Sequence, residues 1–227
     1  MGRETSGERV TRATQPVPPT QEQRVKQPGP DEALAMLLDG NRRYVEDRPR
    51  HPHQRRTHRR HVSAGQHPFA AIMGCGDSRV PPEIVFDEGL GDLFVIRSAG
   101  HIVDEALVGS LEFAVGEFGV PLILVLGHER CGAVKAAVEE VLEGGAASGH
   151  IESVLEAIRP AVEEARGRHA GDGSDLVDEA VRSNVELVVG QLRSDEPILA
   201  ERVQAGQLRI VGAYYNLEDG AVSVIVP

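Results

Sequence analysis

The sequence predicts an α/β fold with a mostly parallel central sheet of four strands plus an antiparallel edge strand, and with helices on both faces. Two observations support this fold class. Short apolar runs alternate with longer segments whose apolar residues recur at helical spacing, which is typical of parallel strands joined by crossover helices. The turn sequence Glu218-Asp219-Gly220 separates the last two apolar runs, so the final strand is expected to pair antiparallel to the one before it.

The predicted strands are short apolar runs bounded by turn residues. The first run follows Pro68 and stops at Gly74, a pattern that favours a buried parallel strand. Similar runs recur along the chain. We predict parallel strands at residues 69–74, 93–97, 122–126 and 208–213, and the edge strand at residues 221–226.

The predicted helices carry apolar residues every three or four positions. Asp31 is expected to cap the first helix, because an aspartate side chain can accept a hydrogen bond from a free backbone N–H of the first turn. The apolar stripe of this helix comprises Leu34, Leu37, Leu38 and Tyr44. Further helices are predicted at residues 102–118, 131–142, 151–165 and 176–192.

Composition separates a tail from one domain. Residues 1–30 are rich in Pro, Gln, Thr and charge and have almost no large apolar side chains, so we predict a disordered tail. Residues 31–227 are expected to form a single domain. Two cysteines, no secretory apolar segment and no stretch as long as a membrane span favour a cytoplasmic protein with reduced thiols and no membrane partner.

The charge is unevenly distributed. The net charge is -11, yet residues 1–70 carry 13 Arg and Lys against 8 Asp and Glu, while residues 71–227 carry 11 against 27. Such an acidic body disfavours a nucleic-acid partner. The stretch from Arg48 to Pro68 holds five histidines among six arginines, without interleaved aromatic residues. We interpret it as a solvated connection rather than a metal or phosphate-backbone site.

Two cysteines and a histidine follow predicted strands. Cys75 directly follows the first strand, and His128 and Cys131 follow the third. If these strands are parallel neighbours, the three side chains meet at the carboxyl edge of the sheet, where open α/β sheets place their chemistry. Cys and His suit Zn²⁺, and three protein ligands are typical of a catalytic site with one open position. The alternatives are two small buried cysteines with an ordinary loop histidine, or a redox pair.

An acidic and a basic residue follow the first cysteine within four positions. Asp77 is near enough to reach a metal or its water, and Arg79 can bind that carboxylate with two charge-assisted hydrogen bonds. The carboxylate then stays ionised and can accept a hydrogen bond from a zinc-bound hydroxide, which fixes the lone pair that faces the substrate. Zinc supplies this hydroxide near neutral pH. The alternative interpretation is an ordinary loop ion pair.

The two cysteine segments resemble a known family. The paired motifs Cys75-Gly76-Asp77-Ser78-Arg79-Val80 and Gly127-His128-Glu129-Arg130-Cys131-Gly132 are similar to those of the β-class carbonic anhydrases. Arg97-Ser98-Ala99-Gly100-His101 and Gly40-Asn41-Arg42-Arg43-Tyr44 resemble two further segments of that family. The likeness extends from about Asp31 to Val226.

The resemblance implies that residues 31–227 are a zinc-binding catalytic domain. In it, Cys75, His128 and Cys131 bind the metal, Asp77 and Arg79 form the catalytic pair, and attack of zinc-bound hydroxide on CO₂ gives bicarbonate and a proton. It also implies a homodimer or homotetramer whose active sites are lined across a subunit boundary.

The resemblance also implies a substrate-binding set. Gln66 matches a substrate-orienting glutamine, Phe94 matches an apolar wall, and Gly132 closes the second motif. Taken without the resemblance, Gln66 is interpreted as a solvated loop amide and Phe94 as a strand core residue. Departures from the family pattern are Ser98 and His101, in place of asparagines, and Phe113, where a tyrosine is expected. His101 is interpreted either as a proton relay or as a hydrogen-bonded loop histidine.

Two alternative functions stay open at the level of sequence. The same zinc hydroxide can attack CS₂ or COS, so a hydrolase of these substrates is possible on this scaffold. A non-catalytic zinc-stabilised oligomer is the other alternative. The presence of Asp77 and Arg79 disfavours it, because a purely structural metal site has no use for this pair.

Overall fold

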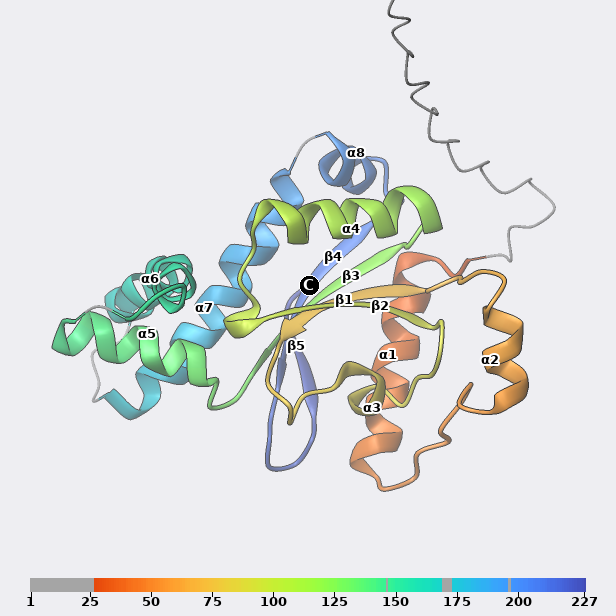
Figure 1. Ribbon diagram of the computed structural model, residues 1–227, viewed down its shortest axis with the longest axis horizontal. Coiled ribbons are helices and arrows are strands. Elements are labelled where there is room, and N and C mark those ends of the chain that lie inside the picture. The colour runs from red at the N-terminus through yellow and green to blue at the C-terminus, as the bar shows by residue number, and fades with distance from the viewer. Residues whose placement is uncertain (1–26, 146, 169–172, 196) are drawn as a thin grey trace, which may run out of the picture.

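The computed structural model describes residues 27–145, 147–168, 173–195 and 197–227. Within them the chain forms a sheet of five strands in the order β2-β1-β3-β4-β5 (Figure 1). The strands are β1 (Ala70–Cys75), β2 (Leu93–Ser98), β3 (Leu122–His128), β4 (Arg209–Tyr215) and β5 (Val222–Val226). Of the predicted disordered tail, residues 1–26 lie outside the described residues.

The predicted fold class is confirmed. Strands β2, β1, β3 and β4 pair in parallel, and β5 pairs antiparallel to β4 at the edge. The two central strands β1 and β3 are buried along their whole length, as expected for parallel strands covered on both faces. The carboxyl ends of these strands therefore emerge together at one edge of the sheet.

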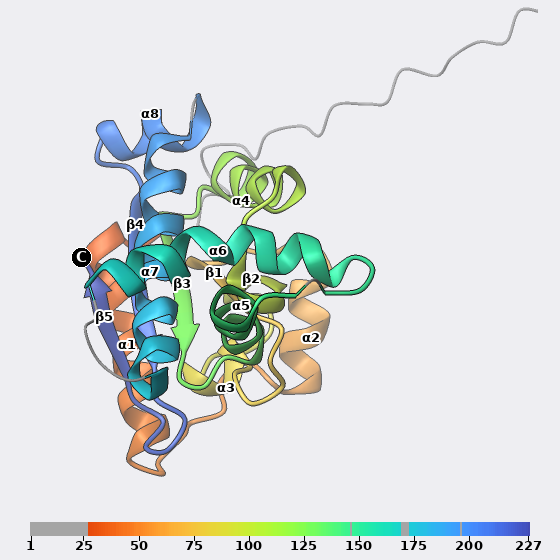
Figure 2. The same cartoon turned by 90° about the vertical axis from the view of Figure 1, so that its left-hand side faces the viewer.

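Helices cover both faces of the sheet. One face packs on α1 (Pro30–Val45) and α3 (Pro82–Val85). The other face packs on α4 (Glu105–Phe118), α7 (Gly173–Ser194) and α8 (Ile198–Gln204). Helices α5 (Gly132–Glu143) and α6 (Ile151–Arg168) pack against α7 beyond the sheet (Figures 1 and 2). None of the described helices combines the length and the apolar character that crossing a membrane requires.

The first helix begins differently from the prediction. Its N-cap is Gly29, with no side-chain cap, and Asp31 instead lies in the first turn. There its carboxylate accepts a hydrogen bond of 2.6 Å from Arg209. Its negative charge also interacts favourably with the positive, amino-terminal end of the helix dipole. The expected capping role of Asp31 is therefore wrong. Asp104 provides such a cap for α4, where it accepts a hydrogen bond from the Leu107 N–H at 2.8 Å.

Three short helices were not predicted. Helix α2 (Arg56–Val62) lies in the stretch interpreted as a solvated connection, and none of its residues is buried. An apolar stripe is the signal that predicts a helix, and α2 has none. Helices α3 and α8 are only four and seven residues long, which is too short for a periodic pattern.

A buried asparagine joins three parts of the fold. Asn41 in α1 is 5% exposed, and its amide nitrogen donates to the carbonyl oxygens of Val85 and Gly220, at 3.1 and 2.8 Å. Its amide oxygen accepts a hydrogen bond from the Val222 N–H at 2.9 Å. One side chain thus connects α1 to α3 and to the β4–β5 hairpin. All its partners are backbone groups, which need hydrogen-bond partners when they are buried.

Replacing Asn41 by leucine is expected to lower the free energy of unfolding by about 2–4 kcal/mol, because three buried backbone groups lose their partners. Urea denaturation measures this change. The control is Arg42→Ala, which removes an exposed ion pair with Asp39 and is expected to change stability by less than about 0.5 kcal/mol. Similar losses in both variants would contradict this account of Asn41.

Candidate metal centre

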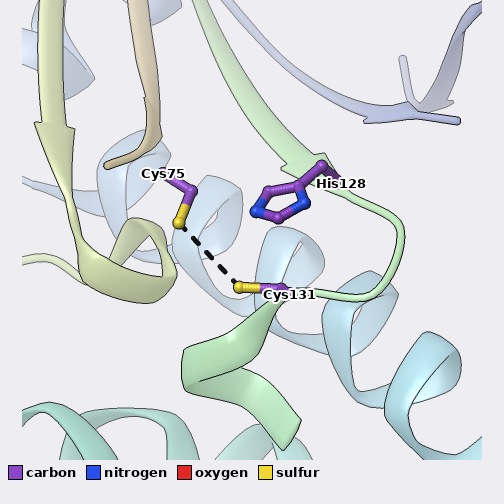
Figure 3. Close-up of side chains that lie close together, drawn as sticks. All are labelled: Cys75, His128 and Cys131. Carbon is purple, nitrogen blue, oxygen red and sulfur yellow. Dashed lines mark hydrogen bonds between the residues drawn. The ribbon is translucent and has the colours of Figure 1, made fainter. Parts of the chain in front are cut away.

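Two strand ends and one helix start form the site. Cys75 is the last residue of β1 and His128 the last of β3, and these strands are parallel neighbours with Gly74 opposite Leu126. Cys131 is the residue immediately before α5, which begins at Gly132. The chain therefore brings the three predicted ligands to the same edge of the sheet, as Figure 3 shows.

The three side chains are close together and buried. Their sulfur and nitrogen atoms all lie within 4.8 Å of one another, and the two sulfurs are 3.9 Å apart. Cys75 is 6% exposed, and His128 and Cys131 are fully buried. Among the described residues this is the one group of three potential metal ligands at such distances. Two sulfurs and an imidazole nitrogen are a donor set that suits Zn²⁺.

The imidazole of His128 presents a free lone pair to the sulfurs. Its Nδ1 lies 2.9 Å from the carbonyl oxygen of Glu129, which can only accept, so the proton is on Nδ1. Nε2 is then an unprotonated acceptor, and it is buried without a hydrogen-bond partner. A buried polar atom without a partner is unusual in a folded protein, and a metal ion would satisfy it.

A hydrogen bond joins the two cysteines, whose sulfurs lie 3.9 Å apart. The hydrogen bond from Cys131 is the main reason that the pKa of Cys75 lies well below its ordinary value. The same bond, together with burial, raises the pKa of Cys131. Two thiolates together carry the charge that a divalent cation would neutralise, so the charge of the donor set also fits a metal ion.

Asp77 and Arg79 make the predicted bidentate contact. Arg79 Nε donates to Asp77 Oδ1 at 2.9 Å and Nη2 donates to Oδ2 at 2.7 Å. These bonds are the main reason that the pKa of the Asp77 carboxyl lies well below its usual range. Asp77 Oδ2 is 3.9 Å from His128 Nε2, so the carboxylate borders the ligand set while it is bound to the arginine.

Arg97 is a site residue whose role sequence reasoning missed. Its Nε donates to the carbonyl oxygen of Cys75 at 2.7 Å, and its Nη2 donates to that of Asp77 at 2.5 Å. The signal in the sequence is a single arginine near the end of an otherwise apolar strand, opposite Gly74. That signal marks an unusual strand residue, but only the fold shows which carbonyls it reaches.

The structure brings only part of the predicted substrate-binding set to the site. Gly132 is exposed and directly follows Cys131. Gln66 is exposed in the loop before β1, and Phe94 lies opposite Ala71 near the start of β2, where it packs on Phe118. Because β1 rises about 3.3 Å per residue, Gln66 and Phe94 lie at the end of the strands opposite to the candidate metal ligands of the same chain.

The structure favours one of the two interpretations of His101. The side chain is fully buried, and burial lowers its pKa to about 4. Its Nε2 lies 2.9 Å from the amide nitrogen of Asn184. A neutral, enclosed imidazole in a hydrogen bond is not a group that exchanges protons with bulk water. His101 is therefore described better as a hydrogen-bonded histidine than as a proton relay.

The histidine-rich stretch does not form a second metal group in the described residues. The rings of His53 and His58 stack with their centres 4.1 Å apart, and His53 Nδ1 lies 2.7 Å from the Asp92 carboxylate. His58 Nε2 lies 2.9 Å from the carbonyl oxygen of Leu90. These contacts attach the stretch to the loop before β2, in keeping with its interpretation as a connection.

Comparisons with known proteins agree with this geometry. Residues 70–222 match the family model described as carbonic anhydrase. Over 84% of its length the chain is 46% identical to carbonic anhydrase 2 of Mycobacterium tuberculosis, covering 90% of that protein. A β-carbonic anhydrase of Coccomyxa, solved with acetazolamide, superposes with a TM-score of 0.68 at 28% identity, with 86% of each chain covered. The chain belongs to the β-carbonic anhydrase family. The family predicted from the paired motifs is thus confirmed.

Two further matches extend the comparison. The carbonic anhydrase of Mycolicibacterium smegmatis is 44% identical over 86% of this chain and 93% of its own length. A tetrameric β-carbonic anhydrase of Sordaria macrospora has a TM-score of 0.68 at 23% identity, and the match covers 86% of this chain and 97% of that one. At that identity the second match shows the shared fold.

Replacing Arg97 by leucine is expected to weaken metal binding by about tenfold or more, because the carbonyls of Cys75 and Asp77 lose their charged donor. Competition with a chromophoric chelator measures the affinity. Lys135→Ala serves as the control, because Lys135 is an exposed residue of α5 that pairs with Glu139. Unchanged affinity in folded Arg97→Leu protein would contradict the role of Arg97.

Proposed function

We propose that this protein is a zinc-dependent carbonic anhydrase, which interconverts CO₂ and water with bicarbonate and a proton. The observation that carries the proposal is the buried group of Cys75, His128 and Cys131, in which His128 Nε2 has no partner, beside the arginine-bound carboxylate of Asp77. Membership of the β-carbonic anhydrase family supports the same reaction.

Each residue of the site has a separate task in this proposal. Cys75, His128 and Cys131 would hold zinc through two thiolates and one imidazole nitrogen. Zinc bound there would supply hydroxide from water near neutral pH. Asp77 would accept a hydrogen bond from that hydroxide and so orient its lone pair toward CO₂. Arg79 keeps Asp77 ionised and holds its carboxylate away from the metal.

The positions of Gln66 and Phe94 favour an active site shared between subunits. Both residues lie at the amino end of the strands, whereas the metal ligands of the same chain lie at the carboxyl end. In a homodimer, or a homotetramer built from dimers, Gln66 and Phe94 line the substrate cleft of the neighbouring subunit, and Gly132 lines that of its own. The tetrameric relative from Sordaria macrospora supports a homo-oligomer.

A reducing compartment suits this site. Both cysteines are free and must stay deprotonated thiolates to bind zinc, so a cytoplasmic location is proposed. The matched relatives carry the name carbonic anhydrase, which disfavours the CS₂ or COS hydrolase and the non-catalytic oligomer.

Stopped-flow CO₂ hydration on protein of measured zinc content tests the proposal. The wild type is expected to hold one zinc per chain and to be active, and Cys75→Ala is expected to lose both. Asp77→Asn is expected to keep the metal and to lose about 100-fold in kcat/KM, because a neutral amide is a weaker hydrogen-bond acceptor than the carboxylate and loses the ion pair with Arg79. Asp39→Asn, an exposed change in α1, is the matched control.

Two results would contradict the proposal. Stoichiometric zinc without hydration anywhere from neutral to moderately alkaline pH would exclude carbonic anhydrase activity. Full activity of Asp77→Asn would remove Asp77 from the reaction.

Mixed dimers test the shared active site. Gln66→Ala and Cys75→Ala chains are co-expressed with different tags, and the dimer that contains one chain of each is isolated. If Gln66 acts across the boundary, this dimer has one complete site and is expected to show about half of the wild-type activity per dimer. If Gln66 acts within its own chain, the only zinc-bearing site lacks the glutamine, and the dimer stays as inactive as Gln66→Ala.

A further inference from the structure

A hydrogen bond reaches the metal-ligating sulfur of Cys75 from a neighbouring turn. The backbone N–H of Gly100 donates to Cys75 Sγ at 3.3 Å. Gly100 belongs to the Ala99–His101 turn, which follows β2 where Ser98 pairs with Cys75. A donor aimed at a thiolate stabilises its negative charge and orients the sulfur, so the position of this turn matters to the metal centre.

The turn has an unusual backbone and little free space. Gly100 and His101 both have positive φ values, 67° and 45°, and the left-handed region is unfavourable for a histidine. A Cβ on Gly100 would lie 2.5 Å from Ile158 Cδ1 and 3.2 Å from Ala133 Cβ, so the turn is pressed against α6 and α5. Such a conformation persists only where surrounding groups hold it.

Asn184 of α7 holds the turn from another helix, in addition to Ser98, whose Oγ donates to the Ile102 carbonyl oxygen across the turn at 3.0 Å. Asn184 Nδ2 donates to the Gly100 carbonyl oxygen at 3.0 Å and to His101 Nε2 at 2.9 Å. The carbonyl can only accept, which fixes the orientation of the amide and makes Nε2 of the histidine an acceptor. Asn184 is 3% exposed and His101 is fully buried, so both bonds are shielded from water.

We propose that Asn184 is a positioning residue of the metal centre, whose amide locks the Ala99–His101 turn so that the Gly100 N–H stays on Cys75 Sγ. The inference rests on the proposed metal site and adds a residue from α7 that lies 109 positions after Cys75. It also assigns a role to His101, because its imidazole is the second acceptor to which the Asn184 amide donates a hydrogen bond.

Cobalt-substituted protein tests the proposal, because its thiolate-to-metal charge-transfer band reports the electron density on the sulfurs. Asn184→Leu removes both donors at similar volume. The band is expected to move to longer wavelength, since a sulfur without its hydrogen bond gives up charge more easily, and the metal affinity measured by chelator competition is expected to fall about 10-fold to 100-fold. If this variant does not fold, Asn184→Ala replaces it.

Ser183→Ala is the matched control. Ser183 is the preceding residue of α7, and it is fully buried with a hydroxyl that has no partner among the described residues. Its removal is expected to leave both the band and the affinity unchanged. A change equal to that of Asn184→Leu would overturn the proposal, because it would show a general disturbance of α7.

The remaining outcomes separate this proposal from the metal site itself. Folded Asn184 variants with wild-type band and affinity would overturn the role of Asn184 alone. Weaker binding with an unshifted band would assign Asn184 a purely structural role and would also overturn it. Wild-type protein that binds neither cobalt nor zinc would instead overturn the proposed metal centre.

Discussion

The parallel pairing of β1 with β3 is the constraint on which the rest of the site depends. These strands are buried at every position, and their last pair, Gly74 with Leu126, lies one residue before Cys75 and two residues before His128. A slip of one residue would turn the buried side chains of a strand to the opposite face. The register that buries the core therefore also sets Cys75 beside His128, and the tight connection to α5 returns Cys131 to the same place.

Backbone N–H and C=O groups make many of the hydrogen bonds that orient the buried candidate ligands and the loop around them. The Glu129 carbonyl fixes the tautomer of His128, and the Gly100 N–H donates to Cys75 Sγ. Arg97 binds the Cys75 and Asp77 carbonyls, so its charge stabilises the loop through main-chain oxygens. The three candidate ligands are buried, and a buried environment strengthens each of these electrostatic interactions.

Sequence patterns predicted the core of the fold better than its short segments. The strands and long helices were found because burying one face imposes a repeating apolar pattern. Helix α2 lacks such a pattern, and Asp31 lies within the first turn although its residue type favours a cap. The predicted strand at residues 122–126 also ended too early. Strand β3 continues through Gly127 to His128, because pairing with β4 extends it beyond its apolar run.

By itself the sequence predicted the three candidate ligands, the family and the segments that form strands, because residue type and spacing along one strand or loop are local properties. The tertiary structure alone decided which nitrogen of His128 is free, which carbonyls Arg97 reaches, and that Asn184 binds the turn beside Cys75. It also placed Gln66 at the strand end opposite to the ligands of its own chain. These facts depend on contacts between segments far apart in the chain, and packing of the whole core sets such contacts.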